Sequence, residues 1–179
     1  SYLFPRAHAV AYVMMAFRIA WFKVYHPLAF YAAYFSIRAK AFDLRIMTGD
    51  LKTQMTEFNR IKALDRGASP KDKDLMSALE VSMEMYQRGY RFVNVDIQHS
   101  EARRFSIKDG ALLPPFLAID SLGETVADAI VAEREERPFT SLKDLQRRCK
   151  VSNTIIDLMK ELKCCGELPE DEQMSLFGA

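Results

Sequence analysis

The placement of proline most limits what this chain can fold into, because the first prolines mark helix starts and leave long uninterrupted runs between them. Proline has no N–H and a fixed φ, so it is tolerated in the first turn of a helix but not in its interior. Ala7–Tyr25 lies between Pro5 and Pro27 and contains neither glycine nor proline. We predict one helix of about five turns there, and a second, opened by Pro27, over Leu28–Ser36.

Capping residues predict the remaining helices. Ser69 precedes Pro70 at a helix start, and Gly89 supplies a left-handed stop. Apolar residues then recur at helical spacing, as in Leu51, Met55, Phe58 and Ile61 or in Leu75, Leu79, Met83 and Tyr86. The predicted helices after residue 40 are 50–64, 69–88, 125–136, 141–148 and 152–163.

Between Tyr90 and Leu113 the apolar period changes to two. Phe92–Ile97 and Phe105–Ile107 alternate between apolar and polar residues, and Asp109-Gly110 is typical of a tight turn. The sequence therefore predicts a mainly α fold with a small β element.

Composition indicates a folded soluble protein. The 179 residues include 25 Lys and Arg against 24 Asp and Glu, 49% are apolar, and glycine and proline number seven each. Three cysteines without Cys-x-x-Cys spacing favour a reducing, cytoplasmic compartment and no structural metal site. Arg18, Lys23 and Pro27 interrupt the apolar stretch Ala7–Ile37, so we expect no membrane span and no membrane partner.

The two ends of the chain carry opposite charge. Residues 1–42 hold five basic and no acidic residues, for a segment charge of +5, while residues 166–179 hold four acidic and no basic ones, for −4. This polarity favours an anionic partner at the front end. The alternative is that both ends are simply solvated.

The front segment has the outline of a phosphate site. A helix beginning near residue 5 points its free amides and positive dipole end at whatever lies before it, and Arg6 and His8 add charge there. Tyr2 and Phe4 lie two residues apart and offer a surface on which a base could stack. The alternative is that His8 and Tyr12 are core residues, with Tyr2 and Phe4 as a hydrophobic staple.

Residues 119–130 have the spacing of a helix-hairpin-helix motif. Gly123 would permit the tight turn and Ala127 the close packing of the two helices. Such hairpins bind duplex phosphates through backbone amides, which cannot distinguish bases. Asp120, Glu124 and Asp128 oppose phosphate binding, so a purely structural hairpin stays open, and Arg147, Arg148 and Lys150 could offset this acidity. The candidate DNA-binding residues are Ser121, Leu122, Gly123, Glu124 and Thr125.

The end of the chain carries a short apolar peptide within an acidic segment. Residues 166–179 contain Pro169 and are expected to form an unpacked, flexible tail. Leu176 and Phe177 could insert into an apolar groove of a partner while Gln173 hydrogen-bonds at its rim. The candidate partner-binding residues are Gln173, Met174, Ser175, Leu176 and Phe177.

Several strings resemble bacterial replicative DNA polymerases of family C, in particular the PolC-type DNA polymerase III. They are Phe4-Pro-Arg-Ala-His-Ala-Val-Ala-Tyr12, Arg18-Ile-Ala-Trp-Phe-Lys23, His26-Pro-Leu-Ala-Phe-Tyr-Ala-Ala-Tyr-Phe-Ser36, Asp96-Ile-x-x-Ser100 and Leu113-Pro-Pro-Phe-x-Ala-Ile119. The resemblance runs from residue 1 to residue 177. It implies polymerase fingers over 1–90, a duplex-DNA-binding module with the hairpin over 91–165, and a tail over 166–179 that binds the sliding clamp.

The resemblance also implies roles for the front residues. Tyr2 would stack on the nascent base pair and Phe4 would support that pocket, while Arg6 and His8 would face the triphosphate of the incoming deoxynucleotide or the primer end. Tyr12 would contribute more weakly. In the family the position of Arg6 is often lysine, and Pro-Gly usually stands where this chain has Asp120-Ser121.

Catalysis is expected to need more than this chain. The resemblance places the aspartates that hold two Mg²⁺ ions in a palm upstream of the fingers, so no catalytic or metal-binding residue is assigned here. We expect a C-terminal piece of a polymerase that is inactive alone and works with template-primer DNA and the remaining polymerase domains. The alternatives are a non-catalytic adaptor that joins DNA to the clamp, and a helical pair over the first 40 residues that docks a protein.

Overall fold

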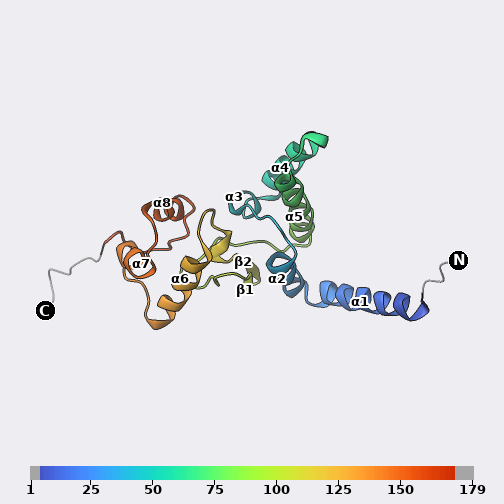
Figure 1. The fold of residues 1–179 in the computed structure, drawn as a ribbon, viewed down its shortest axis with the longest axis horizontal. Helices are drawn as coiled ribbons and strands as arrows, with labels where there is room; N and C mark the ends of the chain where they lie inside the picture. Colours follow the sequence, from blue (N-terminus) through green and yellow to red (C-terminus); the bar gives the residue numbers. More distant parts are fainter. Residues whose placement is uncertain (1–4, 172–179) are drawn as a thin grey trace.

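The computed structural model describes residues 5–171, and it is mainly helical with one small β-hairpin, as predicted (Figure 1). Helix α1 extends to one end of an elongated molecule, α4 and α5 lie together on one side, and α6, α7 and α8 gather at the other end. The helices are α1 (Arg6–Tyr25), α2 (Pro27–Ile37), α3 (Leu44–Met47), α4 (Leu51–Ala63), α5 (Pro70–Gln87), α6 (Glu124–Glu136), α7 (Leu142–Cys149) and α8 (Asn153–Glu161). The short elements are η1 (Asp65–Gly67), η2 (Phe116–Ala118), β1 (Ser106–Lys108) and β2 (Ala111–Leu113).

Side-chain caps fix most helix starts where the sequence predicts them. Asp50 caps α4, and Ser69 forms a reciprocal capping box with Asp72 at the start of α5. Ser141 and Ser152 cap α7 and α8. Each such cap stabilises its helix by about 1 kcal/mol because it satisfies an amide that the helix leaves open. The four-residue helix α3 was not predicted.

The β element is smaller than predicted. Strands β1 and β2 pair antiparallel, and Asp109 and Gly110 both have positive φ in the turn between them, as that turn type requires. The predicted strand at 92–97 is wrong, since Phe92 makes only an isolated bridge to Leu112. Val93 N–H still donates to the carbonyl of Leu112 in β2 at 2.9 Å, but Val95 N–H donates to the side chain of Asn94.

The alternating apolar residues of segment 92–97 instead pack into two separate hydrophobic clusters. Phe92 belongs to a cluster built mainly from α2, α4 and α5, whereas Val95 and Ile97 belong to one around α6, α7 and α8. Phe42 packs against both clusters, and its ring centroid lies 5.2 Å from that of Phe92. The predicted division at residues 90 and 165 stays a prediction.

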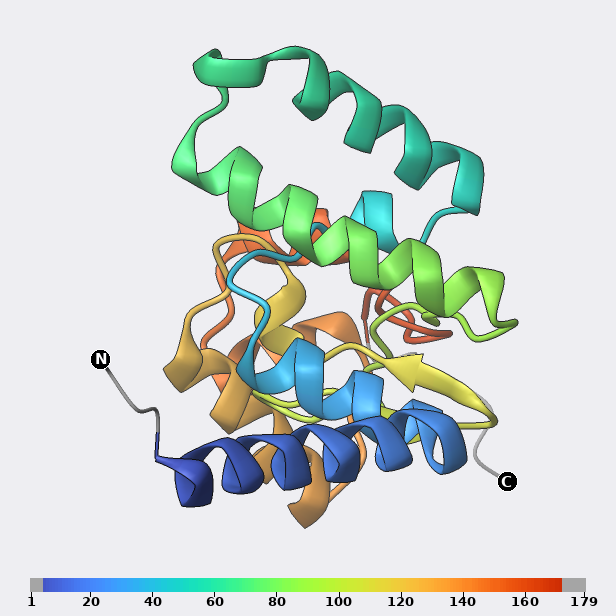
Figure 2. The same ribbon diagram turned by 90° about the vertical axis from the view of Figure 1, so that its right-hand side faces the viewer.

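Helix α1 differs from the others because none of its residues is buried. Figure 2 shows it lying along one edge of the molecule, beside α2. By length and composition α1 is able to cross a membrane, and the expectation that charges break this stretch was wrong. Arg18 and Lys23 are accommodated inside the helix, and Pro27 lies beyond its end, at the start of α2.

The start of the predicted tail is packed. The backbone N–H of Leu142 donates to the carbonyl of Pro169 at 2.9 Å, and that of Lys143 donates to the carbonyl of Glu170 at 3.2 Å. Leu168 packs against the cluster around α6–α8. The expectation of an unpacked segment is therefore wrong for residues 166–171, while residues 172–179 lie outside the described part.

Candidate nucleic-acid interface

The predicted hairpin forms between η2 and α6. Ser121 adopts φ of 63°, Leu122 is 5% exposed, and the backbone N–H of Leu122 donates to the carbonyl of Ile119 at 3.2 Å. Gly123 is the N-cap of α6 with φ of −75°, so the sequence argument that glycine makes the turn was wrong. Ser121 makes it, at the position where the family usually has glycine.

Four of the five predicted hairpin residues are exposed around the start of α6. Ser121, Gly123, Glu124 and Thr125 face solvent, whereas Leu122 turns inward and holds the loop on the core. Ala127 is fully buried, as the motif predicts. No side chain caps α6 at Gly123, so its first amides are presented to the surface. Backbone amides in this arrangement can bind a phosphate.

The acidic side chains beside this hairpin have a cationic partner that sequence reasoning missed. Arg103 Nη1 donates to Glu124 Oε2 at 2.5 Å, and Arg103 also binds both carboxylate oxygens of Asp128, at 3.1 and 2.5 Å. The hydrogen bond from Arg103 lowers the pKa of Asp128. Arg103 therefore offsets part of the negative charge at the start of α6. It lies 21 residues before Glu124, so helical spacing could not reveal the contact.

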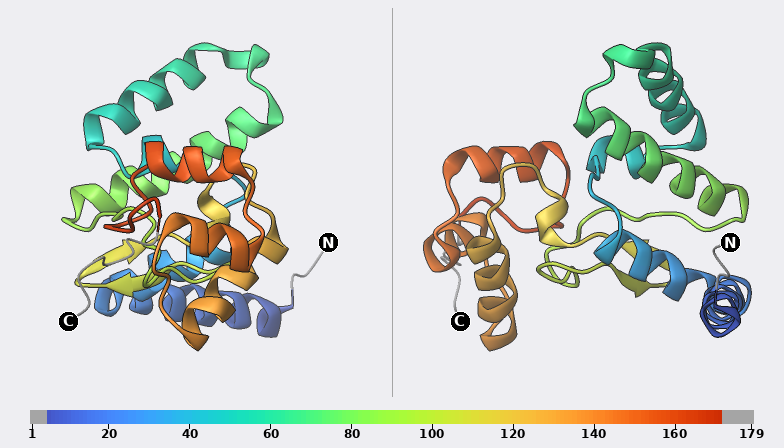
Figure 3. Two further views of the ribbon diagram at one scale, coloured as in Figure 1. Left: turned by 90° about the vertical axis from the view of Figure 1, so that its left-hand side faces the viewer. Right: turned by 45° about the vertical axis from the view of Figure 1, so that its right-hand side comes forward.

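A second hairpin, which the sequence analysis did not identify, joins α7 to α8. Lys150 has φ of 54°, Val151 is 3% exposed, and Ser152 is the N-cap of α8. Lys150 and Ser152 repeat the backbone conformations of Ser121 and Gly123, and Val151 is buried like Leu122. Figure 3 shows α6, α7 and α8 gathered at the end of the molecule away from α4 and α5.

The repeat extends into the helices that follow the two turns. Ala127 and Ile130 of α6 are fully buried, and 29 residues later Ile156 and Met159 of α8 are buried in the same order. Thr125 and Thr154 also correspond, each two residues after its N-cap. This spacing of 29 residues, with a buried apolar residue before each cap, is the signal that could have identified the second hairpin.

The two hairpins differ in charge and in capping. The first turn of α8 contains no acidic residue, while that of α6 contains Glu124. Lys150 is exposed and makes no ion pair within the described residues. The Ser152 hydroxyl accepts from Ile155 N–H at 3.4 Å, whereas the equivalent amide of α6, that of Val126, donates to the carbonyl of Gly123 at 3.1 Å. The second turn therefore offers positive charge, whereas the first carries Glu124 and has no side-chain cap.

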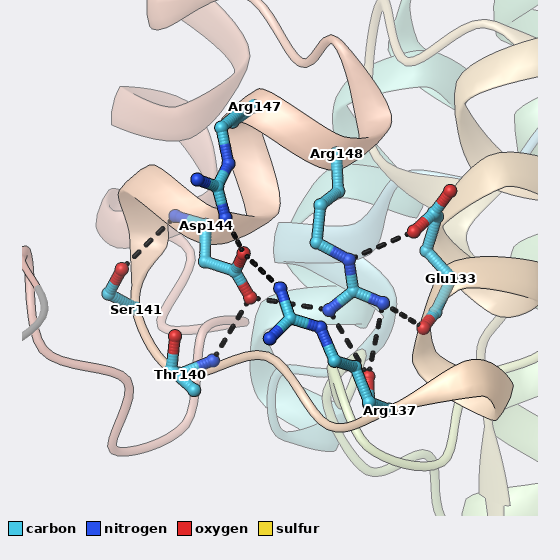
Figure 4. Close-up of polar contacts among 7 residues, drawn as sticks. All are labelled: Glu133, Arg137, Thr140, Ser141, Asp144, Arg147 and Arg148. Carbon is cyan, nitrogen blue, oxygen red and sulfur yellow. Dashed lines mark hydrogen bonds and ion pairs between the residues drawn. The ribbon is translucent and has the colours of Figure 1, made fainter.

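The neighbouring arginines serve mainly to join α6 and α7 (Figure 4). Asp144 is 2% exposed, and its carboxylate accepts hydrogen bonds from Arg147 at 2.8 Å, from Arg148 at 3.2 Å and from Arg137 at 3.2 Å. Burial raises the pKa of Asp144, but these hydrogen bonds outweigh it and hold the pKa below its ordinary value. Arg148 also donates to Glu133 at 2.9 Å. Arg148 is thus committed to structure, while most of Arg147 remains exposed.

Comparison with known proteins identifies the wider context. A family model described as a helix-hairpin-helix motif matches residues 89–173. The PolC-type DNA polymerase III of Caldanaerobacter subterraneus subsp. tengcongensis is 48% identical over 177 residues, and that of Streptococcus suis is 49% identical over 180 residues. The Streptococcus pyogenes protein of the same name is 46% identical, and each alignment covers 99% of this chain. The chain is a homologue of one segment of PolC-type DNA polymerase III. It spans only 12–13% of the length of these relatives.

The residues that the PolC resemblance assigns to nucleotide binding lie on α1 where they are described. Arg6, His8 and Tyr12 are all exposed, and the rings of His8 and Tyr12 meet edge to face with centroids 4.5 Å apart. The alternative that His8 and Tyr12 are core residues is wrong within this chain. Tyr2 and Phe4 lie outside the described residues, as does the predicted clamp-binding segment 173–177.

Proposed function

We propose that this chain supplies nucleotide binding, duplex binding and clamp tethering to a DNA-synthesising polymerase of the PolC type. The observation that carries the proposal is the 46–49% identity to PolC-type polymerases over 99% of the chain. Identity at this level over a contiguous segment supports the same role for the segment in a longer enzyme.

Duplex DNA is bound by the two hairpins. The exposed amides at the start of α6 and the positive charge of Lys150 before α8 each suit a backbone phosphate. Neither turn presents side chains arranged to recognise base edges, so binding is independent of sequence. That property suits a polymerase, which must hold the primer-template duplex at every position.

The incoming deoxynucleoside triphosphate is bound before and along the first turn of α1. Arg6 and His8 carry the contacts to the triphosphate or the primer end. Tyr2 stacks on the nascent base pair and Phe4 supports that pocket, while Tyr12 supports His8 from the next turn. A guanidinium suits a phosphate because its donors form a planar fork. The apolar, acid-free surroundings of residues 5–42 favour the approach of a polyanion.

The Mg²⁺ ions of the full enzyme take their ligands from elsewhere. Among residues 5–171, no group of three or more His, Cys, Asp or Glu side chains is placed to hold a metal ion. The resemblance to PolC places the metal chemistry in the palm of the longer polymerase, and we propose that this chain supplies binding and orientation and is inactive alone.

The test compares two variants of the full-length polymerase. Arg6→Ala should raise the KM for deoxynucleotides at least tenfold and leave duplex affinity unchanged. Lys150→Glu should weaken duplex binding about tenfold and reduce its salt dependence by about one phosphate contact, with the nucleotide KM unchanged at saturating DNA. Each variant is the control for the other. Equal kinetics to the parent in the first would remove the nucleotide assignment, and unchanged duplex affinity in the second would remove the hairpin assignment.

A further inference from the structure

Helix α1 carries large apolar side chains around its whole circumference. Successive residues of a helix are rotated by about 100°, so Phe22, Ile19, Val13 and Trp21 project in four directions about 60° to 120° apart. Each of these residues is at least 49% exposed. A surface helix of a soluble protein has one apolar stripe, whereas a helix that is apolar on every side is normally surrounded. Among the described residues, α1 contacts α2 along part of one side and α5 at Lys23, and the rest of its surface is uncovered.

The position of α1 is fixed even without a cover. Arg88 of α5 donates through Nη2 to the carbonyl of Lys23 at 2.9 Å and through Nη1 to Tyr31 at 3.1 Å. Lys23 Nζ pairs with Glu84 of α5 at 2.7 Å and lies over the ring of Phe30. The end of α1 is therefore held on α5 from two sides. A helix held in this way presents its apolar surface already ordered, which lowers the entropic cost of binding.

The uncovered surface of α1 contains two apolar hollows. An open groove of about 470 Å³ runs between α1 and α2, lined by Ile19, Phe22, Phe30, Ala33, Tyr34 and Ile37 among others. A second hollow of about 460 Å³ lies along α1 beside Phe17, Trp21 and Val24. Almost all of the lining surface is carbon. These hollows suit the apolar side chains of a packed polypeptide.

The charges around α1 indicate what kind of polypeptide surface could bind in these two hollows. No acidic residue occurs between residues 5 and 42, and Arg18, on the wall of the second hollow, makes no ion pair among the described residues. The occupant therefore presents an apolar face with a carboxylate for Arg18. A second copy of this chain has no acidic residue on α1 or α2 to meet that need by a symmetric contact.

We propose that α1, beyond the nucleotide-facing residues of its first turn, is enclosed on all sides by the polymerase polypeptide outside these 179 residues, which inserts apolar side chains into the groove between α1 and α2. In the relatives, 87–88% of the polypeptide lies outside the segment that matches this chain. That part of the same polypeptide could cover α1. This inference rests on the proposed place of the chain in a longer polymerase. It makes α1 an interior element of that enzyme.

The test is thiol labelling of the full-length polymerase with its reactive cysteines replaced by serine. Val10→Cys, Ala11→Cys and Ala16→Cys place single thiols about 100° to 140° apart around α1, and Ala63→Cys at the exposed end of α4 is the matched control. Cys149, Cys164 and Cys165 are buried and add little background. We expect all three α1 thiols to react at least 100-fold more slowly than Ala63→Cys, and all four to react alike in denaturant.

Other outcomes overturn the proposal. Fast labelling at any one of the three positions means that α1 is an ordinary surface helix. Protection that depends on protein concentration identifies a second copy as the cover, and protection that appears only with vesicles of phosphatidylcholine and phosphatidylglycerol identifies a membrane. Labelling does not depend on catalysis, so it tests the enclosure of α1 separately from the proposed function. Fast labelling with normal nucleotide and duplex assays would contradict only the enclosure, and slow labelling with failed assays would contradict only the proposed function.

Discussion

The carboxylate of Asp144 shows how one buried residue can fix the relation between two helices. It lies at the first turn of α7 and accepts hydrogen bonds from three arginines, of which Arg137 follows the end of α6. Ser141 caps the same turn by accepting from the N–H of Asp144. Because the side chain is inaccessible to solvent, each lost hydrogen bond would leave charge unpaired in a dry environment.

Removing that carboxylate should therefore be costly. We expect Asp144→Ala to lower the free energy of unfolding by about 3 kcal/mol, since the nearly buried charge of Arg148 would keep only Glu133 as its ionic partner. Glu161→Ala removes one side of the exposed Arg45–Glu161 pair and should cost less than about 0.5 kcal/mol. Urea unfolding at pH 7 measures both.

The folded pKa of Asp144 is lowered, so its contribution to stability is present above the unfolded pKa of about 3.9 and is lost as the pH falls through the folded value. A variant whose acid unfolding matched the parent would contradict this account.

Ser121 carries backbone strain that glycine would remove. A non-glycine residue with φ near 60° costs about 1 kcal/mol, and Ser121 has φ of 63°. Ser121→Gly should stabilise the chain by about 0.5 kcal/mol after allowance for the greater freedom of glycine in the unfolded state. Gly123→Ala is the control, because Gly123 has an ordinary φ and an added Cβ would meet nothing within 4 Å. Thermal unfolding of both variants measures the difference, and destabilisation by Ser121→Gly would show that its side chain matters more than its backbone.

At the scale of elements, local signals predicted the helices, and long-range contacts decided what the sequence could not show. Ser69, Ser141 and Ser152 act as caps because capping depends on residues within one turn. The stripe predicted for α4 was partly wrong, since Met55 is 48% exposed and Gln54 is buried. Gln54 faces inward because it donates to the carbonyl of Met47 and accepts from the hydroxyl of Ser82, partners that no periodicity reveals.

The candidate site likewise has features that local sequence signals predicted and features that depend on long-range contacts. The hairpin at 119–130 was predictable because its motif is contiguous, whereas Arg103 reaches its acidic partners across the fold. The second hairpin was missed because Lys150 and Ser152 replace the residues of the usual motif while keeping its backbone conformation. At the front of α1, the residues predict a phosphate site in outline, and the resemblance to PolC adds the specific nucleotide-binding roles.

The acidic residues of α6 should restrain duplex binding. Glu124 and Asp128 repel phosphate and also occupy Arg103, so Glu124→Gln combined with Asp128→Asn should both remove repulsion and free a cation. We expect duplex affinity to rise about fivefold at 0.1 M salt, with a steeper salt dependence. Asp74→Asn combined with Glu80→Gln on α5 makes the same charge change and should leave affinity unchanged. Fluorescence anisotropy with a primer-template duplex over a salt series measures this, and equal affinities for both double variants would show that α6 does not face the phosphates.

At the scale of the whole molecule, the proposed nucleotide contacts and the proposed duplex contacts lie at opposite ends of the structure. The nucleotide assignment falls at the free end of α1, whereas the hairpins lie at the far end of the molecule beside α7 and α8. Between them, Asn94 donates to the carbonyl of Leu162 at 2.5 Å, and Phe42 packs on both clusters. Binding at one end is therefore connected to the other through packed structure.

The proposed clamp-binding segment, residues 173–177, comes just after an anchored part of the chain. Residues 169 and 170 accept backbone hydrogen bonds from the start of α7, and Lys160 Nζ donates to Glu170 at 2.5 Å. A clamp bound at 173–177 would thus be tied close to the hairpins, which raises the effective concentration of the polymerase on DNA.

In the full-length polymerase, Gln173→Ala with Leu176→Ala should reduce clamp affinity at least 50-fold and shorten the DNA made per binding event. Lys160→Ala, which removes only an exposed contact of the anchor, should leave clamp affinity unchanged. Surface plasmon resonance with immobilised clamp measures both, and an affinity equal to the parent in the double variant would place the tether outside residues 173–177.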